Sequence, residues 1–204
     1  MSLSIESIRL AQRHLRKRDP VMRRLIDAVG PFTLRLERDR FRMLVRSIIS
    51  QQISGKAAKS IRERLEGLVA PEKISSHNLA ALSVAELRSA GVSSQKAGYL
   101  HDLAAKVDAG AVRLQRVARM SDDEVIAELV QVKGIGVWTA QMCLMFSLGR
   151  LDVFPHDDLG IRSALRNLYG LTDLPDKQTS LEIAKPWRPY ATIASWYCWR
   201  SHEL

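Results

Sequence analysis

Residues 129–161 contain a glycine turn between two helical patterns, followed by a pair of aspartates at the start of a third. The turn is Lys133-Gly134-Ile135-Gly136. Glycine takes left-handed backbone angles without a Cβ clash and lets another molecule come close to the backbone. A glycine turn that opens a helix also presents backbone N–H groups at the positive end of the helix dipole. The turn therefore predicts an anion site that a phosphate would fit.

The same turn has a plainer interpretation as an ordinary connector between two packed helices. The flanking patterns, over residues 123–130 and 137–148, are helical in either case. Gly-x-Gly is a short pattern that does not distinguish these interpretations by itself.

Two adjacent aspartates, Asp157 and Asp158, follow a glycine stop at Gly149 and precede a helical pattern over residues 159–169. An aspartate at a helix start usually serves as a cap, because its carboxylate accepts the N–H groups of the first turn. Two aspartates allow a division of labour, in which one caps the helix and the other acts in a cleft.

The segments VKGIGVWTA and FPHDDLGI together resemble the helix–hairpin–helix DNA glycosylase superfamily, whose mark is a hairpin, a loop with glycine or proline, and then an aspartate. The resemblance continues through residues 41–58 and 185–197, so it covers most of the chain. It is strongest to the 3-methyladenine DNA glycosylase II branch, which removes alkylated bases in base excision repair.

The resemblance implies an all-α fold of two interlocked helical lobes with a cleft between them. Residues 39–148 would form the lobe that carries the helix–hairpin–helix motif, at about 123–148. Residues 1–38 and 149–204 would form the other lobe. The first matching motif begins at Phe41, so the β-rich N-terminal domain of some relatives is expected to be absent.

Asp158 matches the catalytic aspartate of the family. Breaking an N-glycosidic bond generates an oxocarbenium-like sugar, which needs a nearby negative charge and a water nucleophile. One carboxylate can stabilise this cation and also orient or deprotonate the water. The resemblance gives Asp158 this role, and Asp157 is then expected to be structural, capping the helix or bracing the loop.

Bifunctional members of the superfamily carry a lysine at the position of Trp138, and this lysine attacks the sugar as an amine. Tryptophan cannot form that Schiff base, and the nearest lysine, Lys133, is expected to contact phosphate. The resemblance therefore implies a monofunctional N-glycosyl hydrolase that leaves an abasic site, with no lyase activity.

Aromatic residues are expected to select the base. Alkylated purines such as 3-methyladenine and 7-methylguanine carry positive charge, which an aromatic pocket can favour by cation–π attraction and stacking. Trp138 and Trp196 match pocket positions of the branch, and core packing is the alternative for each. Packing is the expected role of the other aromatic residues of this region, Trp187, Tyr190, Tyr197 and Trp199.

The target base must leave the duplex, and a protein side chain has to fill the gap. In the superfamily this wedge comes from the loop that matches residues 50–54. An amide there can hydrogen-bond the orphaned partner base, so Gln52 is the first choice and Gln51 the second. An exposed helix terminus is the alternative interpretation.

Residues 90–97 repeat the shape of residues 133–140, with a glycine turn followed by a helix that has alanine at the same offset. A second backbone–phosphate contact near Lys96 would explain this repeat. A plain connection between two packed helices explains it equally well.

The chain is basic, with 31 Lys and Arg against 22 Asp and Glu and a net charge of +9. Such an excess favours a polyanion as partner, in agreement with double-stranded DNA that contains damaged bases. The sequence has no apolar run of about 18 residues and no signal-peptide pattern at its start. We therefore expect a cytoplasmic, nucleoid-associated protein without membrane contact, and a monomer, because DNA must reach the cleft.

Cofactor requirements follow from the cysteine count. Cys143 and Cys198 are the only cysteines, too few for the four-cysteine iron–sulfur loop of the endonuclease III branch. Both lie in apolar helical patterns and are expected to be buried thiols. With no His/Cys cluster at metal-ligand spacing, no cofactor is expected to be required. A hairpin of backbone donors and carbonyls can hold a monovalent cation.

Two other functions fit parts of the sequence. The chain could be a non-catalytic helix–hairpin–helix module that recognises DNA shape, although pure binding needs neither Asp158 nor an aromatic pocket. It could also be a glycosylase for oxidised, deaminated or mismatched bases. Trp138 disfavours the oxidised-base lyases but leaves deaminated bases such as hypoxanthine open.

Overall fold

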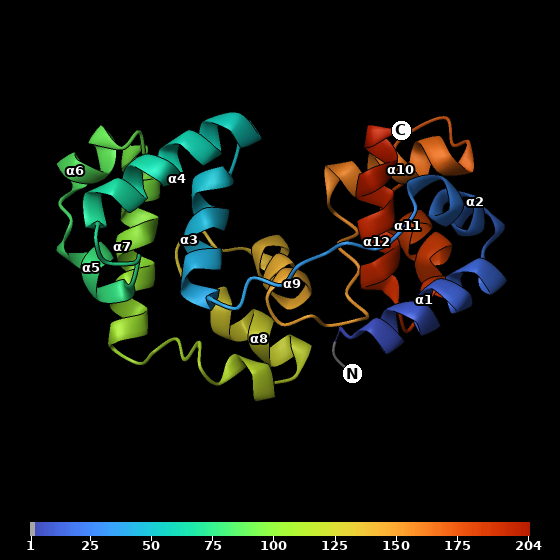
Figure 1. The fold of residues 1–204 in the computed structure, drawn as a ribbon, viewed down its shortest axis with the longest axis horizontal. Helices are drawn as coiled ribbons and strands as arrows, with labels where there is room; N and C mark the ends of the chain where they lie inside the picture. Colours follow the sequence, from blue (N-terminus) through green and yellow to red (C-terminus); the bar gives the residue numbers. More distant parts are fainter. Residues whose placement is uncertain (1–2) are drawn as a thin grey trace. The chain divides into compact units, whose positions relative to one another are not determined.

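The computed structural model describes residues 3–204, and the regular elements of this range are all helices (Figure 1). The expectation of an all-α fold is therefore confirmed. None of these helices is both long enough and apolar enough to span a membrane.

The chain divides into two compact units. Met1–Leu36 and Leu144–Leu204 form one, which we call the terminal unit, and Glu37–Cys143 form the other, the central unit. The division passes through helix α9 (Val137–Phe146). The boundaries expected from the sequence follow residues 38 and 148.

The terminal unit is built around helix α12 (Ala191–Arg200), which packs against three other helices (Figure 1). These partners are α1 (Ile5–Arg18), α2 (Pro20–Val29) and α10 (Leu159–Tyr169). Helix α11 (Lys177–Ala184) precedes α12 and leads into a short 3₁₀ turn. Eight of the ten residues of α12 are buried. This helix has no strongly polar face, because its neighbours cover it on several sides.

Asp19 anchors the terminal unit through a buried carboxylate. Its Oδ1 accepts the backbone N–H groups of Val21 and Met22, at 2.8 and 3.1 Å, and so caps α2. Its Oδ2 accepts the indole N–H of Trp187 at 2.9 Å and the hydroxyl of Tyr169. A buried carboxylate is tolerated here because it is fully supplied with donors.

The central unit contains six α-helices and one 3₁₀ turn before α9, and α7 packs on α3, α5 and α6. The six are α3 (Arg40–Ser50), α4 (Gly55–Val69), α5 (Ser76–Ala81), α6 (Val84–Ser89), α7 (Ser94–Asp108) and α8 (Asp122–Leu129). The helix starts follow the sequence closely. The two Ser-x-x-Glu patterns at Ser83 and Ser121 form capping boxes, in which the serine and the glutamate bond each other's backbone N–H.

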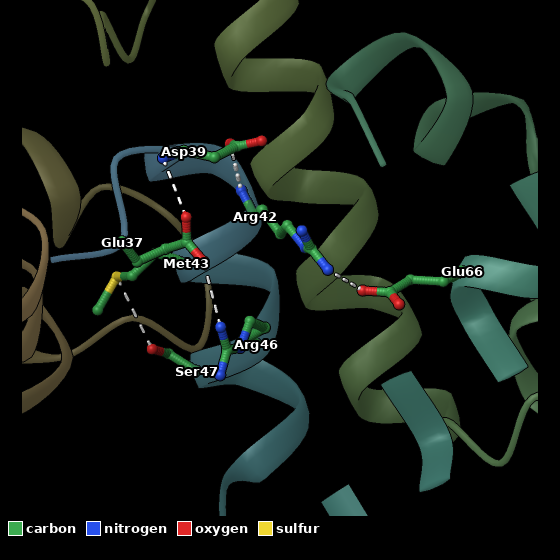
Figure 2. Close-up of polar contacts among 7 residues, drawn as sticks. All are labelled: Glu37, Asp39, Arg42, Met43, Arg46, Ser47 and Glu66. Carbon is green, nitrogen blue, oxygen red and sulfur yellow. Dashed lines mark hydrogen bonds and ion pairs between the residues drawn. The ribbon is translucent and has the colours of Figure 1, made fainter. Parts of the chain in front are cut away.

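Polar contacts fix the start and one face of α3 (Figure 2). Asp39 caps the helix by accepting the N–H of Arg42 at 2.9 Å. Glu37 accepts the N–H of Asp39 at 3.2 Å and pairs with Arg46 at 3.2 Å. Arg42 also pairs with Glu66 of α4 at 2.5 Å. These contacts set the direction of α3, whose other end carries the predicted wedge residues.

Candidate functional site

Asp158 lies at the start of α10 and is its N-cap. Its Oδ1 accepts the backbone N–H of Ile161 at 2.8 Å. This bond satisfies one of the N–H groups of the first turn that have no partner within the helix. The same oxygen accepts the indole N–H of Trp199 at 2.8 Å. The predicted catalytic carboxylate is thus held by donors from two different helices.

Asp157 does not cap α10, so this part of the prediction is wrong. The helix begins at Leu159, and the residue directly before it, Asp158, takes the capping position. The side chain of Asp157 is 81% exposed and lies 2.9 Å from Nδ1 of His156. The division of labour expected between the two aspartates is therefore absent, since one carboxylate both caps the helix and matches the catalytic position.

The loop before Asp158 is tied to the start of α12. Thr192 donates its backbone N–H to the carbonyl of Leu151 at 3.0 Å, and its hydroxyl accepts the N–H of Val153 at 3.0 Å. Asp152 accepts the N–H of Ala191 at 3.1 Å. Helix α12 therefore holds the loop that leads to Asp158 and also supplies Trp199.

Trp196 also comes from α12, one turn before Trp199, and is 8% exposed. Its ring packs on Phe32, with centroids 4.6 Å apart, and edge-on against Tyr197 at 5.0 Å. The guanidinium of Arg200 lies 5.8 Å from the ring centre. Trp196 thus contributes to the core of the terminal unit, and its pocket role stays a prediction.

Trp138 belongs to the central unit, in the first turn of α9. It is 40% exposed, and the preceding Val137 is 54% exposed, whereas Thr139 and Ala140 are buried. Core packing does not account for an indole exposed to this extent. The exposed part of the indole is surface that another molecule can reach.

The hairpin needs glycine at residue 134 for an intramolecular reason. Gly134 has φ +81°, and a Cβ there would lie 2.2 Å from the ring of Tyr99. Ile135 is buried and anchors the turn in the core. Gly136 differs from Gly134, because it is exposed and a Cβ there would meet nothing within 4 Å. Gly136 directly precedes α9, and its carbonyl accepts the N–H of Ala140 at 3.1 Å, so it occupies the N-cap position, where glycine is favoured, and it leaves open space beside the helix start.

Asp102 of α7 links that helix to the hairpin between α8 and α9. Its Oδ2 accepts the backbone N–H of Lys133 at 2.8 Å and the ammonium of Lys106 at 2.7 Å. Burial opposes ionisation of Asp102, but the bonds from Lys106 and Lys133 outweigh it and lower the pKa of the carboxyl. The backbone N–H of Lys133 is therefore used inside the protein, and only its exposed side chain can contact an anion.

The two glutamines of the predicted wedge have different environments. The side chain of Gln51 donates from Nε2 to the carbonyl of Gly134 at 2.7 Å, so it is tied to the hairpin. Gln52 is exposed and has φ +56°, a left-handed conformation that costs a non-glycine residue free energy. Strained backbone of this kind is held in place by its surroundings and is common at functional sites. Gln52 therefore fits a protruding wedge better than Gln51.

Lys96 does not extend a second phosphate-binding turn. Its ammonium donates to the carbonyls of Ile49 and Gln51, both at 2.7 Å, and so closes the C-terminal end of α3. Burial lowers the pKa of this lysine. The lysine of the repeat at residues 90–97 therefore supports the turn that carries Gln52.

The two cysteines are enclosed in the described part of the chain. Cys143 and Cys198 are free and buried, as expected, and burial raises the pKa of Cys143 to about 11. No group of three or more His, Cys, Asp or Glu side chains in this range is arranged to hold a metal ion.

Trp199 packs against the core of the terminal unit, as expected, but its bond to Asp158 was not foreseen from the sequence. Its spacing of three residues from Trp196 places both indoles near one face of a helix, and that was the only signal in the sequence. Its partner lies 41 residues earlier in the chain, so only the folded structure reveals the bond.

Residues 45–189 match the family described as HhH-GPD superfamily base excision DNA repair protein. The chain is 33% identical to DNA-3-methyladenine glycosylase 1 of Schizosaccharomyces pombe, over 98% of this chain and 90% of that protein. It is also 30% identical to the alkylbase DNA glycosidase-like protein mag2 of the same yeast, over 95% and 93% of the two chains.

Solved structures agree with these relatives. The S. pombe 3-methyladenine DNA glycosylase in complex with abasic DNA superposes with a TM-score of 0.89 at 33% identity, covering 95% of this chain and 97% of that one. A DNA-3-methyladenine glycosidase from Bacillus halodurans gives a TM-score of 0.80 at 35% identity, with 92% and 86% covered. The chain belongs to the HhH-GPD superfamily of base excision DNA repair proteins.

Proposed function

We propose that the chain is a monofunctional DNA glycosylase that hydrolyses the N-glycosidic bond of flipped alkylated purines in duplex DNA and leaves an abasic site. The observation that carries the proposal is the carboxylate of Asp158, held at the start of α10 by the N–H groups of Ile161 and Trp199. Relatives over nearly the whole chain that are named as 3-methyladenine glycosylases support the same reaction.

In this proposal Asp158 stabilises the oxocarbenium-like sugar and orients the attacking water. Both tasks need a fixed negative charge, because preorganised charge does not have to reorient as the transition state forms. A carboxylate held by two donors on one oxygen has this property. The purine carries a positive charge from alkylation, so its departure needs little acid help.

Trp138 contributes to base selection and excludes lyase chemistry from its position. An exposed indole can stack on a flipped base and attracts a cationic purine more than a neutral one. It has no amine to attack the sugar, so no Schiff base forms there and the DNA strand stays intact. A pocket contribution from Trp196 is also part of the proposal, limited to the small exposed part of its ring.

The central unit supplies the DNA backbone contact and the wedge. The open space at Gly136 lets a phosphate approach the N–H groups at the start of α9, with the side chain of Lys133 as a cationic contact. Gln52 fills the gap left by the flipped base.

A bound monovalent cation would have to use hairpin carbonyls other than that of Gly134, which accepts the amide of Gln51. No other cofactor is part of the proposal, and the chain would act as a monomer on chromosomal DNA in the cytoplasm.

The test is base release from methylated duplex DNA by the wild type, Asp158→Asn and Asp157→Asn. We expect the wild type to release 3-methyladenine and 7-methylguanine, and Asp158→Asn to be slower by about 10²- to 10⁴-fold. Asp157→Asn removes the same charge one residue away, and its release rate should match the wild type because Asp157 is exposed and does not cap α10.

The product also distinguishes the alternatives. A monofunctional enzyme leaves an abasic strand that breaks only after alkali is added. Strand breakage without alkali would contradict the interpretation of Trp138. Binding to methylated DNA without base release would indicate a binding module, and release of hypoxanthine but not of methylated bases would indicate a glycosylase for deaminated bases.

A further inference from the structure

We propose that Trp199 is a positioning residue for Asp158, which sets the orientation of the catalytic carboxylate through its indole N–H. This inference rests on the proposed function, because it assigns Trp199 a part in the same reaction. It concerns only the terminal unit, which contains both residues.

The two bonds to Asp158 determine its side-chain rotation together. A capping bond alone leaves a carboxylate able to turn about its last torsion, which changes the direction of its plane. Here the N–H of Ile161 and the indole N–H of Trp199 both reach Oδ1, each at 2.8 Å. Since the donors come from α10 and α12, they reach this oxygen from two directions and restrict the plane of the carboxylate. Hydrogen bonds to an ionised carboxylate are roughly twice as strong as neutral ones.

Gly160 provides the space for this contact. It is the second residue of α10, and no left-handed backbone angle requires glycine there. A Cβ at this position would lie 3.0 Å from Oδ1 of Asp158 and 3.1 Å from Cδ1 of Trp199. Glycine lowers helix propensity by about 1 kcal/mol relative to alanine. The close contact between the indole and the carboxylate therefore accounts for glycine at residue 160 despite its lower helix propensity.

The indole itself is held from other sides. The ring of Phe146, at the end of α9, lies 5.6 Å from that of Trp199, with the planes inclined by 38°. Helix α12, which carries Trp199, is also hydrogen-bonded to the loop before Asp158 through Thr192. The same helix therefore helps to position both the indole donor and the carboxylate acceptor. A rigid donor on a rigid element is what precise placement of a catalytic group requires.

A second indole–carboxylate bond in the same unit serves as a matched comparison. Trp187 donates to Oδ2 of Asp19 at 2.9 Å, but both residues are buried and Asp19 has no part in the proposed reaction. Trp187→Phe and Trp199→Phe therefore remove the same kind of bond, the first from the core and the second from the site.

The experiment measures the single-turnover rate of base release at saturating enzyme, the affinity for abasic duplex DNA and the melting temperature. Trp199→Phe keeps the aromatic ring and loses the N–H. We expect its release rate to fall about 10- to 100-fold, the range for misplacing a catalytic group, with DNA affinity near wild type and a melting temperature lowered less than in Trp187→Phe, because Trp199 is less buried. Trp187→Phe should lower the melting temperature. At a temperature where this variant is folded, its rate of base release should equal that of the wild type.

A double variant tests whether Trp199 acts through Asp158. In the Asp158→Ala background, Trp199→Phe should cause no further loss of rate, because residues that act as one unit are not additive. Gly160→Ala is a second way to disturb the pair, and it should slow release while the helix propensity of α10 rises. If Trp199→Phe fails to fold, Gly160→Ala carries the test.

Each outcome has a definite meaning. A full release rate in folded Trp199→Phe, or an equal loss in Trp187→Phe, would overturn the positioning role, as would a further loss in the double variant. A full rate in Gly160→Ala would do the same. Absence of base release by the wild type would instead overturn the proposed function, and this inference with it.

Discussion

Asp158 holds the start of α10 with the same carboxylate that we propose for catalysis. Helix capping needs only an acceptor oxygen, whereas stabilising a cationic sugar needs a full negative charge. These two requirements can be separated experimentally, because asparagine provides the acceptor without the charge.

At this residue we predict different stabilities for two inactive variants. Asp158→Asn should unfold in urea with nearly the wild-type free energy, since asparagine caps helices as well as aspartate does. Asp158→Ala loses the bonds from Ile161 and Trp199 and should be less stable by about 1–2 kcal/mol. Equal loss of stability in both variants would contradict the capping role.

At the scale of the element, the hairpin between α8 and α9 uses its two glycines for different reasons. Gly134 is required by a left-handed backbone angle and by the ring of Tyr99. Gly136 has neither constraint, and its surroundings are open. Intramolecular packing therefore requires one glycine, whereas the other precedes a helix and leaves the open space that the proposed DNA contact needs.

Alanine substitutions separate the two reasons. Gly134→Ala should destabilise the protein by about 1–3 kcal/mol, because the Cβ meets Tyr99 and the backbone angle is strained. Gly136→Ala should leave the urea unfolding curve nearly unchanged and weaken binding to abasic duplex DNA. Wild-type affinity in Gly136→Ala would show that the DNA backbone does not approach this residue.

The link between α7 and the hairpin gives a pH-dependent contribution to stability. The pKa of Asp102 is lowered in the folded state, so between its folded and unfolded pKa values the unfolded chain binds more protons. The contribution is complete above the ordinary value of 3.8 and is lost as the pH falls through the lower folded value.

Asp102→Asn should therefore be less stable than the wild type at pH 7, and the difference should shrink below pH 3.8. Urea unfolding of both proteins across this range measures the effect. A difference that stays constant down to the acid limit would mean that the charge of Asp102 does not support the hairpin.

At the scale of the whole molecule, each unit contains one buried thiol. Cys143 lies in the central unit and Cys198 in the terminal unit. Burial raises the pKa of both thiols, that of Cys143 to about 11. The thiolate is the reactive form, so both cysteines should be inert while the units are folded.

We predict that iodoacetamide at pH 8 labels native protein at least 10³-fold more slowly than unfolded protein, at both cysteines. Mass spectrometry of the peptides that contain Cys143 and Cys198 reports each unit separately. Fast labelling of one cysteine in native buffer would show that the unit containing it opens locally.

The sequence by itself determined most of the helical architecture. Helix starts at Asp19, Ser83 and Ser121 and the stop at Gly30 follow from local chemistry, because caps and glycine angles involve residues only a few positions apart. The hairpin was evident for the same reason, and the resemblance carried by a few short motifs was enough to indicate the family.

Only the tertiary structure decided how the candidate site residues are held. Asp157 was expected to cap the helix or brace the loop, and the cap is Asp158 instead, because both residues precede the same helix start and neither pattern nor spacing separates them. In the structure, Lys96 donates to the C-terminal end of α3, and Trp199 donates to Asp158. These are contacts between residues more than 40 positions apart. Local rules cannot predict such pairings, because they depend on which helix faces pack together.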